Sequence, residues 1–224
     1  MDLRTYKIAD SFTIADDAVF AVTRYMRAMA ETVEIFNVEK NIEYQKRDID
    51  LIWKFKLNGL RMERLIEVKG DTYDRTGNFF FETISNEEHQ TPGCFLYSEA
   101  DDLYYYFVTT KRLYILPLRQ TRAWFIENID KYPLRKTSTL TGTGSFYITV
   151  GRIVPITDVL NAIPDATIHN LANTSILIQE AIVATGEKVE ESSSNVPNFA
   201  ETFALTIEKI ARPIWQIINF VLRQ

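Results

Sequence analysis

Two acidic residues and a Glu-x-Lys tripeptide have the types and spacing of a metal site. Asp48 and Asp50 stand two positions apart in the chain, and so do Glu67 and Lys69. Because side chains alternate between the two faces of a strand, residues two positions apart share one face. Carboxylate oxygens suit Mg²⁺, which takes few protein ligands, keeps several waters and leaves room for a phosphate. These residues therefore predict a magnesium site with a lysine beside it.

Two antiparallel strands, at residues 48–56 and 62–69, are predicted to position these side chains. The dipeptide Asn58-Gly59 lies between their apolar runs and is the strongest short signal for a tight hairpin turn. Such a hairpin would place the two aspartates of the first strand beside the Glu-x-Lys pair of the second, at one end of a small sheet.

The same residues carry a resemblance to a known group of nucleases. An acidic residue on one strand, followed by Glu67-Val68-Lys69 on the next, resembles the core of the PD-(D/E)xK superfamily of restriction-endonuclease-like and Holliday-junction-resolvase-like nucleases. Further similar segments within about residues 15–116 are Tyr44-Gln45 through Asp50-Leu51, Thr76-Gly77-Asn78 and Phe81-Glu82. The resemblance implies an α/β (α+β) fold with a restriction-endonuclease-like core, in which helices flank a central mixed sheet.

The resemblance also implies an activity and a ligand set. It implies a Mg²⁺-dependent endodeoxyribonuclease that hydrolyses phosphodiester bonds, with DNA favoured over RNA and with Mn²⁺ able to replace Mg²⁺. Asp50 and Glu67 would bind the metal, with the carbonyl oxygen of Val68 as a further ligand. Lys69 would orient the attacking water or stabilise the developing negative charge. The alternative is a non-catalytic interaction protein on the same fold, since fold alone does not fix function.

The first acidic residue of the motif has two candidates. The proline that gives the superfamily its name is absent, because Arg47 precedes Asp48 and Ile49 precedes Asp50. Either aspartate therefore fits the motif. We favour Asp50, because the apolar run 51–53 follows it directly, as in Ile-Asp-Leu forms of the motif.

Two glutamates are further candidates for the site. Residues 13–32 are predicted to form a helix, and many members of the resembled superfamily place a glutamate near the metal on such a helix. Glu31 is the only glutamate in this stretch, although a solvent-facing carboxylate is the commoner case. Residues 79–85 are predicted to form a strand, in which Glu82 faces either solvent or the site. A lone buried carboxylate is costly unless it is paired or binds a cation.

The remaining pattern predicts one nuclease-like domain, residues 1–164, and a C-terminal extension, residues 165–224. The extension is expected to contain a flexible linker at about 187–198 and an amphipathic helix at about 199–222, suited to forming a homodimer. Within the domain, the pattern predicts strands at 103–108, 112–116 and 146–155, helices at 118–128 and 156–163, and a loop at 130–145.

Composition narrows the class of protein. The 224-residue chain is 46% hydrophobic and 25% charged, as in soluble globular proteins, and no apolar run is long enough to span a membrane. The single cysteine, Cys94, excludes a disulfide framework and a Cys-rich zinc site. With no apolar leader, the chain is expected in the reducing cytoplasm. The net charge of −5 argues against a protein that coats duplex nucleic acid by bulk electrostatics.

Overall fold

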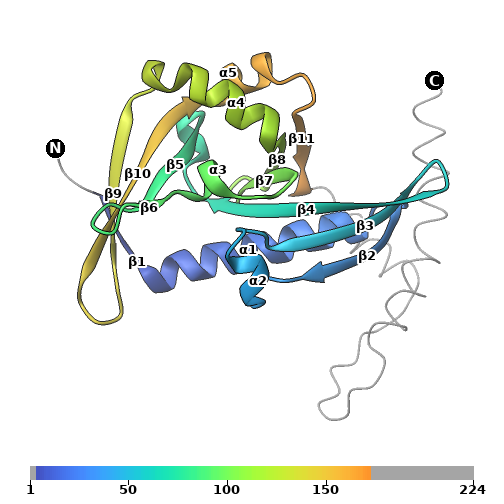
Figure 1. The fold of residues 1–224 in the computed structure, drawn as a ribbon, viewed down its shortest axis with the longest axis horizontal. Helices are drawn as coiled ribbons and strands as arrows, with labels where there is room; N and C mark the ends of the chain where they lie inside the picture. Colours follow the sequence, from blue (N-terminus) through green and yellow to red (C-terminus); the bar gives the residue numbers. More distant parts are fainter. Residues whose placement is uncertain (1–3, 173–224) are drawn as a thin grey trace, which may run out of the picture.

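The computed structural model of the protein describes residues 4–172 of the chain. These residues form a mixed α/β fold of the α+β type, with two mixed sheets and several helices (Figure 1). The predicted linker at 187–198 and the predicted amphipathic helix at 199–222 lie outside the described residues.

The larger sheet has six strands and contains the predicted hairpin. One pair of neighbours, β4 and β7, runs parallel, and the other neighbours run antiparallel. In spatial order the strands are β11 (Thr167–Asn170), β8 (Arg112–Pro117), β7 (Asp102–Phe107), β4 (Leu60–Asp71), β3 (Leu51–Leu57) and β2 (Thr32–Asn37). The long connection from β4 to β7, residues 72–101, carries two strands of the other sheet.

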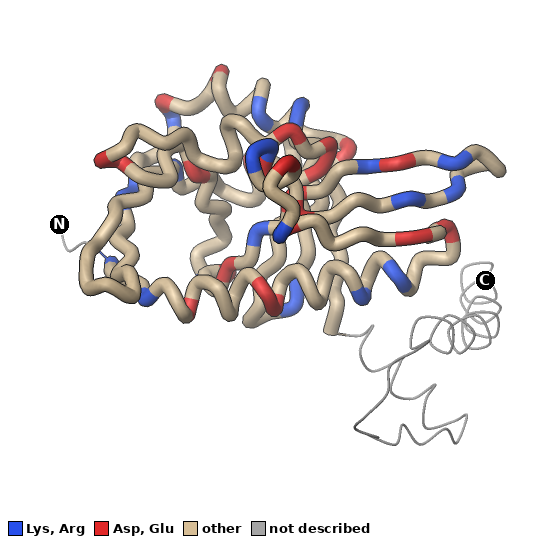
Figure 2. Tube along the Cα trace, turned by 60° about the horizontal axis from the view of Figure 1, so that its bottom comes forward, with Lys and Arg blue, Asp and Glu red and all other residues tan. Residues whose placement is uncertain are grey.

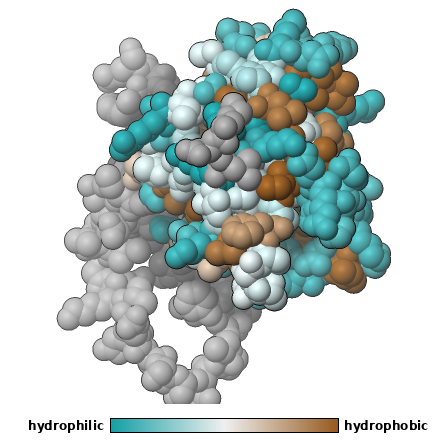
Figure 3. Space-filling view, turned by 90° about the vertical axis from the view of Figure 1, so that its left-hand side faces the viewer, coloured by the Kyte–Doolittle hydropathy of each residue, from teal (hydrophilic) through white to brown (hydrophobic). Residues whose placement is uncertain are grey.

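The smaller sheet has five strands and forms one end of the molecule. Its strands, in spatial order, are β1 (Arg4–Lys7), β9 (Leu134–Leu140), β10 (Phe146–Pro155), β5 (Asn78–Asn86) and β6 (Thr91–Pro92). β1 is parallel to β9, whereas β10 is antiparallel to both of its neighbours. Figure 3 views this end and shows hydrophobic side chains as separate patches among hydrophilic ones.

Helices cover both sides of the six-stranded sheet. α1 (Ile8–Arg27) lies along one side, whereas α4 (Leu118–Asn128) and α5 (Ile156–Ala162) lie on the other (Figure 1). The short helical segments are α2 (Ile42–Gln45), η1 (Asp74–Thr76), α3 (Cys94–Tyr97) and η2 (Ile129–Lys131). No helix within residues 4–172 is long and apolar enough to cross a membrane.

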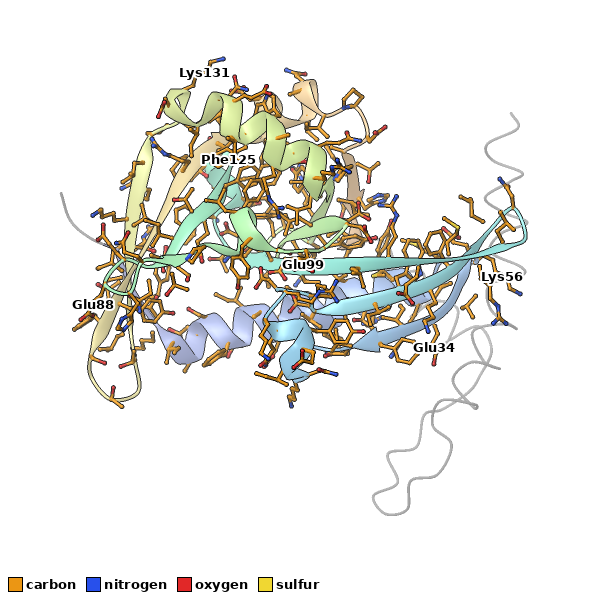
Figure 4. The ribbon with its side chains drawn as sticks, in the orientation of Figure 1. Glu34, Lys56, Glu88, Glu99, Phe125 and Lys131 are labelled. Atoms are coloured by element: carbon orange, nitrogen blue, oxygen red, sulfur yellow. The ribbon has the colours of Figure 1, made fainter. Side chains whose placement is uncertain are left out.

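The alternation of side chains along β4 divides the core into two clusters. Ile66 and Val68 pack on the α1 side, in the cluster that includes Val22 and Met26. The other cluster contains aromatic side chains from β5, α3, β7 and α4, namely Phe79, Phe81, Phe95, Tyr105 and Phe125. Figure 4 shows Phe125 pointing from α4 into this cluster. Glu67 and Lys69, which alternate with the α1-facing residues, therefore project on the side opposite to α1.

Several elements match the sequence-based predictions. The hairpin turn is confirmed, and its residues Asn58 and Gly59 have the positive φ angles, 52° and 81°, that such a turn requires. The predicted helix at 118–128 and the predicted strand at 146–155 match α4 and β10.

The predicted helix at 13–32 is wrong in its bounds, because α1 spans Ile8–Arg27. Thr32 accounts for the earlier end. Its hydroxyl donates a hydrogen bond to the carbonyl of Met26 (2.6 Å) and accepts one from the indole of Trp53 (2.9 Å). These contacts make Thr32 the first residue of β2, so the chain leaves the helix before it.

The predicted loop at 130–145 is also wrong in part, because residues 134–140 form β9. The serine and threonine residues there indicated a loop, but Ser138 and Thr139 are buried between the neighbouring strands. The Ser138 hydroxyl also shares a hydrogen bond of 2.7 Å with Thr5 of β1. Pairing with β1 and β10 therefore outweighs the polar composition of this segment.

The six-stranded sheet continues past residue 164, into the start of the predicted extension. Residues 167–170 form β11, which pairs with β8 at the edge of the sheet. The His169 ring contacts α1, where its Nδ1 lies 2.9 Å from the Tyr25 hydroxyl.

Gly93, the residue after β6, lies against the backbone of β5, where a larger residue does not fit. A Cβ at this position would lie 2.4 Å from the carbonyl oxygen of Glu82, a backbone atom of β5. We expect Gly93→Ala to lower the free energy of unfolding by about 2–3 kcal/mol, because the backbones must move apart. Urea denaturation would measure this. Gly142→Ala is the control, since a Cβ there meets no atom within 4 Å; an equal effect of both changes would contradict the prediction.

Candidate metal centre

The predicted site residues gather where β4 of the larger sheet faces β5 of the smaller one. Glu67 and Lys69 come from β4, and Glu82 comes from β5. Asp48 and Asp50 precede β3, and α3 follows β6 beside them. The site is therefore built between two sheets rather than at one end of a single sheet.

Asp48 is held in a left-handed backbone conformation with φ 55°. This conformation ends the extended segment, so β3 begins at Leu51 and not at residue 48 as predicted. The last residue of α3 and the residue after it fix Asp48 in place. The Ser98 hydroxyl donates to the Asp48 carbonyl (2.8 Å), and the Tyr97 hydroxyl donates to Asp48 Oδ1 (3.3 Å). Asp48 Oδ2 is buried and has no hydrogen-bond partner among the described residues.

Asp50 is bound to the backbone of β4. Its N–H donates to the carbonyl of Ile66 (2.9 Å), and its Oδ2 accepts from the N–H of Val68 (2.8 Å). Asp50 therefore lies opposite Glu67, as the hairpin prediction requires. The side chain of Val68 itself packs on the α1 side.

Glu67 is the most buried carboxylate of the site, with 7% of its surface exposed. Its Oε2 has no hydrogen-bond partner among the described residues. Burial raises the pKa of Glu67 well above its ordinary value, and the charges of Asp50 and Asp48 raise it further. An unsatisfied buried carboxylate is rare in folded proteins, and an ion is one of the accepted explanations.

The Asp48 and Asp50 carboxyl groups are shifted in the same direction. Burial is the main cause in both and raises each pKa to about 6. Hydrogen bonds oppose the shift, from Tyr97 at Asp48 and from the Val68 N–H at Asp50. Three carboxyl groups in one space thus disfavour their own ionisation, and a cation between them would remove that penalty.

Lys69 lies at the edge of this carboxylate group and pairs with Glu82 across the sheets. Lys69 Nζ is 3.5 Å from Glu82 Oε2. The charge of Glu82 raises the pKa of Lys69, so its ammonium is retained. The structure thus brings Glu82 to the site as the ion-pair partner of Lys69. Its partly buried side chain is paired, as a carboxylate in this apolar strand needs to be.

Cys94 belongs to the site, although no sequence pattern linked it to the acidic residues. One ligand atom each from Asp48, Glu67 and Cys94 lie within 4.8 Å of one another. Cys94 is the first residue of α3, and burial raises its pKa well above the ordinary value for a thiol. The position of Cys94 depends on how the connection at residues 72–101 packs. The spacing of residues in the sequence does not reveal this packing.

Glu31 does not join this group. It lies in the exposed turn between α1 and β2, where its carbonyl accepts a hydrogen bond from the Lys56 N–H (2.8 Å). The reason is the placement of α1, which packs on the side of Val68 and not on the side of Glu67.

Comparison with models of known protein families, with curated proteins and with solved structures gives no match to this chain.

The raised aspartate pKa values predict that the metal-free protein loses stability as pH rises. The ordinary pKa of an aspartate is 3.8, whereas the folded-state pKa values of Asp48 and Asp50 are about 6. Between these values the folded state binds more protons than the unfolded state. The contribution of these two aspartates to the free energy of unfolding therefore falls from about pH 4 to pH 6 and is level above.

Removal of one of these charges should stabilise the protein at neutral pH. We expect Asp48→Asn to raise the free energy of unfolding at pH 7 by about 1–3 kcal/mol, and to flatten its fall between pH 4 and pH 6. Urea denaturation in EDTA would measure both. The exposed Asp16, changed to Asn, controls for the loss of one negative charge; a variant no more stable than this control at pH 7 would refute the prediction.

Proposed function

We propose that the protein is a Mg²⁺-dependent nuclease of the PD-(D/E)xK type, which hydrolyses phosphodiester bonds of DNA. The observation that carries the proposal is the buried Glu67 carboxylate, whose Oε2 has no partner among residues 4–172, beside two further carboxylates and a lysine. An oxygen-rich site with an ammonium group beside it suits a divalent cation and a phosphate together.

The residues present fit a hard divalent cation. Glu67 and Asp50, opposite each other on β4 and before β3, would hold it, and the Val68 carbonyl is a further candidate ligand. Asp48 adds a second orphaned oxygen to the same space, so both aspartates are candidates for the first acidic residue of the motif. Mn²⁺, which has similar oxygen chemistry, would serve as a substitute.

The protein's own groups would position the reactants. A bound Mg²⁺ supplies charge neutralisation at the phosphate and lowers the pKa of a coordinated water. Lys69 would donate a hydrogen bond to that water or to a phosphate oxygen as negative charge develops. Glu82 holds the Lys69 ammonium at the edge of the site through their ion pair. The hydroxyl of Tyr97 orients Asp48 by its hydrogen bond to Oδ1.

The basic residues of the projecting β3–β4 hairpin suit a polyanionic substrate. Lys56 on β3 lies directly opposite Arg61 on β4, and both side chains are exposed. Like charges at directly opposed positions destabilise a sheet, so a partner that brings phosphates would relieve their repulsion. Figure 2 shows mostly Lys and Arg positions along the outer part of this hairpin, with an acidic position between those of β4. Figure 4 shows Lys56 near its tip.

Cleavage should depend on Glu67 and Lys69. We expect Glu67→Gln and Lys69→Ala each to lower metal-dependent cleavage by at least about a hundredfold, because one removes a metal ligand and the other a charge-stabilising donor. Single-stranded, duplex and branched DNA, together with RNA, would be incubated with Mg²⁺ or Mn²⁺.

Glu88→Gln is the matched control, because Glu88 is an exposed carboxylate in the turn after β5, distant from the site in Figure 4. It should cleave at the wild-type rate. Unchanged cleavage by Glu67→Gln would exclude this site as the catalytic one. The absence of cleavage by any variant, with no metal-induced thermal shift, would favour a non-catalytic interaction protein.

A further inference from the structure

The Cys94 thiol faces the same space as two of the carboxylates. Its Sγ, one oxygen of Asp48 and one oxygen of Glu67 all lie within 4.8 Å of one another. This set contains a soft sulfur ligand, which the proposed magnesium site does not need, because Mg²⁺ is bound through oxygen.

A second observation, independent of the thiol, indicates a ligand at this point. Asp48 Oδ2 and Glu67 Oε2 are both buried, and neither has a hydrogen-bond partner within the described part of the chain. Glu67 is only 7% exposed, so solvent compensates little for the missing partner. A cation that contacts both oxygens would satisfy them together.

Cys94 is held firmly in its place at the start of α3. The Arg122 guanidinium donates hydrogen bonds to the carbonyls of Phe95 (2.8 Å) and Ser98 (2.6 Å), which spans the helical turn. The ring of Phe95 stacks on that of Phe81, with centroids 4.0 Å apart. The thiol is therefore presented by a packed element, which reduces the cost of ordering it on binding.

The three ligands, one thiol and two carboxylates, suit a cation of the zinc class. Zinc binds cysteine sulfur at about 2.3 Å and carboxylate oxygen at about 2.0–2.2 Å, usually with tetrahedral geometry. Ligand atoms at those distances lie roughly 3.6 Å apart, so the three side chains need to close by about 1 Å. Three protein ligands leave a fourth position for water, as in zinc sites that remain open.

We propose that Asp48, Glu67 and Cys94 bind one thiophilic divalent cation of the zinc class, and that this cation excludes Mg²⁺ by taking Glu67. As the metal–sulfur bond forms, the thiol proton passes to solvent. The first part stands on the geometry of the three ligands and on the two unpartnered buried oxygens. The second part rests on the proposed nuclease function, and it makes zinc an inhibitor of that activity.

Binding is tested by titration of the full-length, metal-free chain with Cd²⁺, a spectroscopic substitute for zinc, in a non-chelating reductant. Sulfur-to-cadmium charge transfer gives an ultraviolet absorption band, and Cys94 is the only cysteine in the sequence that can produce it. We expect the band to saturate at one equivalent and to disappear when Zn²⁺ is added. No band in excess Cd²⁺ would overturn the proposal.

Two variants and one control test Cys94 and Glu67 as ligands. Cys94→Ala should abolish the band, and Glu67→Gln should weaken Cd²⁺ binding by at least about tenfold, because a ligand charge is lost. The control Glu88→Gln should bind as the wild type does. Circular dichroism would confirm that each variant is folded. Equal Cd²⁺ affinity in Glu67→Gln and wild type would refute a shared site, whatever the result with Cys94→Ala.

Competition tests the second part without any cleavage assay. Millimolar Mg²⁺ or Mn²⁺ should raise the apparent Kd for Cd²⁺ in the wild type, because both cations need Glu67. An unchanged Kd would contradict mutual exclusion. If the protein binds Cd²⁺ at Cys94 but cleaves no nucleic acid with Mg²⁺, the nuclease proposal fails while the zinc-class site stands.

Discussion

The Glu67 carboxylate is buried beside two other carboxylates, and the architecture of the site depends on how this charge is compensated. Its Oε2 lacks a partner among the described residues, and burial raises its pKa well above the ordinary value. Lys69 carries the nearest compensating charge, but it is already paired with Glu82 at 3.5 Å. A divalent cation would balance the remaining charge, and the proposed nuclease function rests on this requirement.

The two sheets supply different residues to the site around Glu67. The larger sheet supplies Glu67 and Lys69 from β4, and Asp50, just before β3, is bound to the β4 backbone. The smaller sheet supplies Glu82, and the connection that follows it supplies Cys94. Gly93 lies against the β5 backbone, and this close approach places the following Cys94 next to that strand. The site therefore depends on an interface between sheets.

Local sequence signals predicted the hairpin and the relative positions of Asp50, Glu67 and Lys69. A tight turn and the alternation of side chains along a strand fix these positions. The five-residue shift of α1 was not predictable in the same way, since it depends on hydrogen bonds from Thr32 to distant partners. β9 was missed because pairing with β1 and β10 outweighs its polar composition.

The position of Cys94 beside the carboxylates depends on the fold of a 30-residue connection. No periodicity in the sequence predicts that fold. Glu31 was a candidate only through the resemblance, and the side on which α1 packs separates it from Glu67.

Anomalous diffraction from crystals grown with Mn²⁺ would test the central claim most directly, because it locates the cation without assuming any substrate. We expect a manganese peak about 2.1 Å from a Glu67 carboxylate oxygen, with Asp50 or Asp48 as the next ligand. A fully formed but metal-free Glu67 site, or manganese bound only to exposed carboxylates elsewhere, would contradict it.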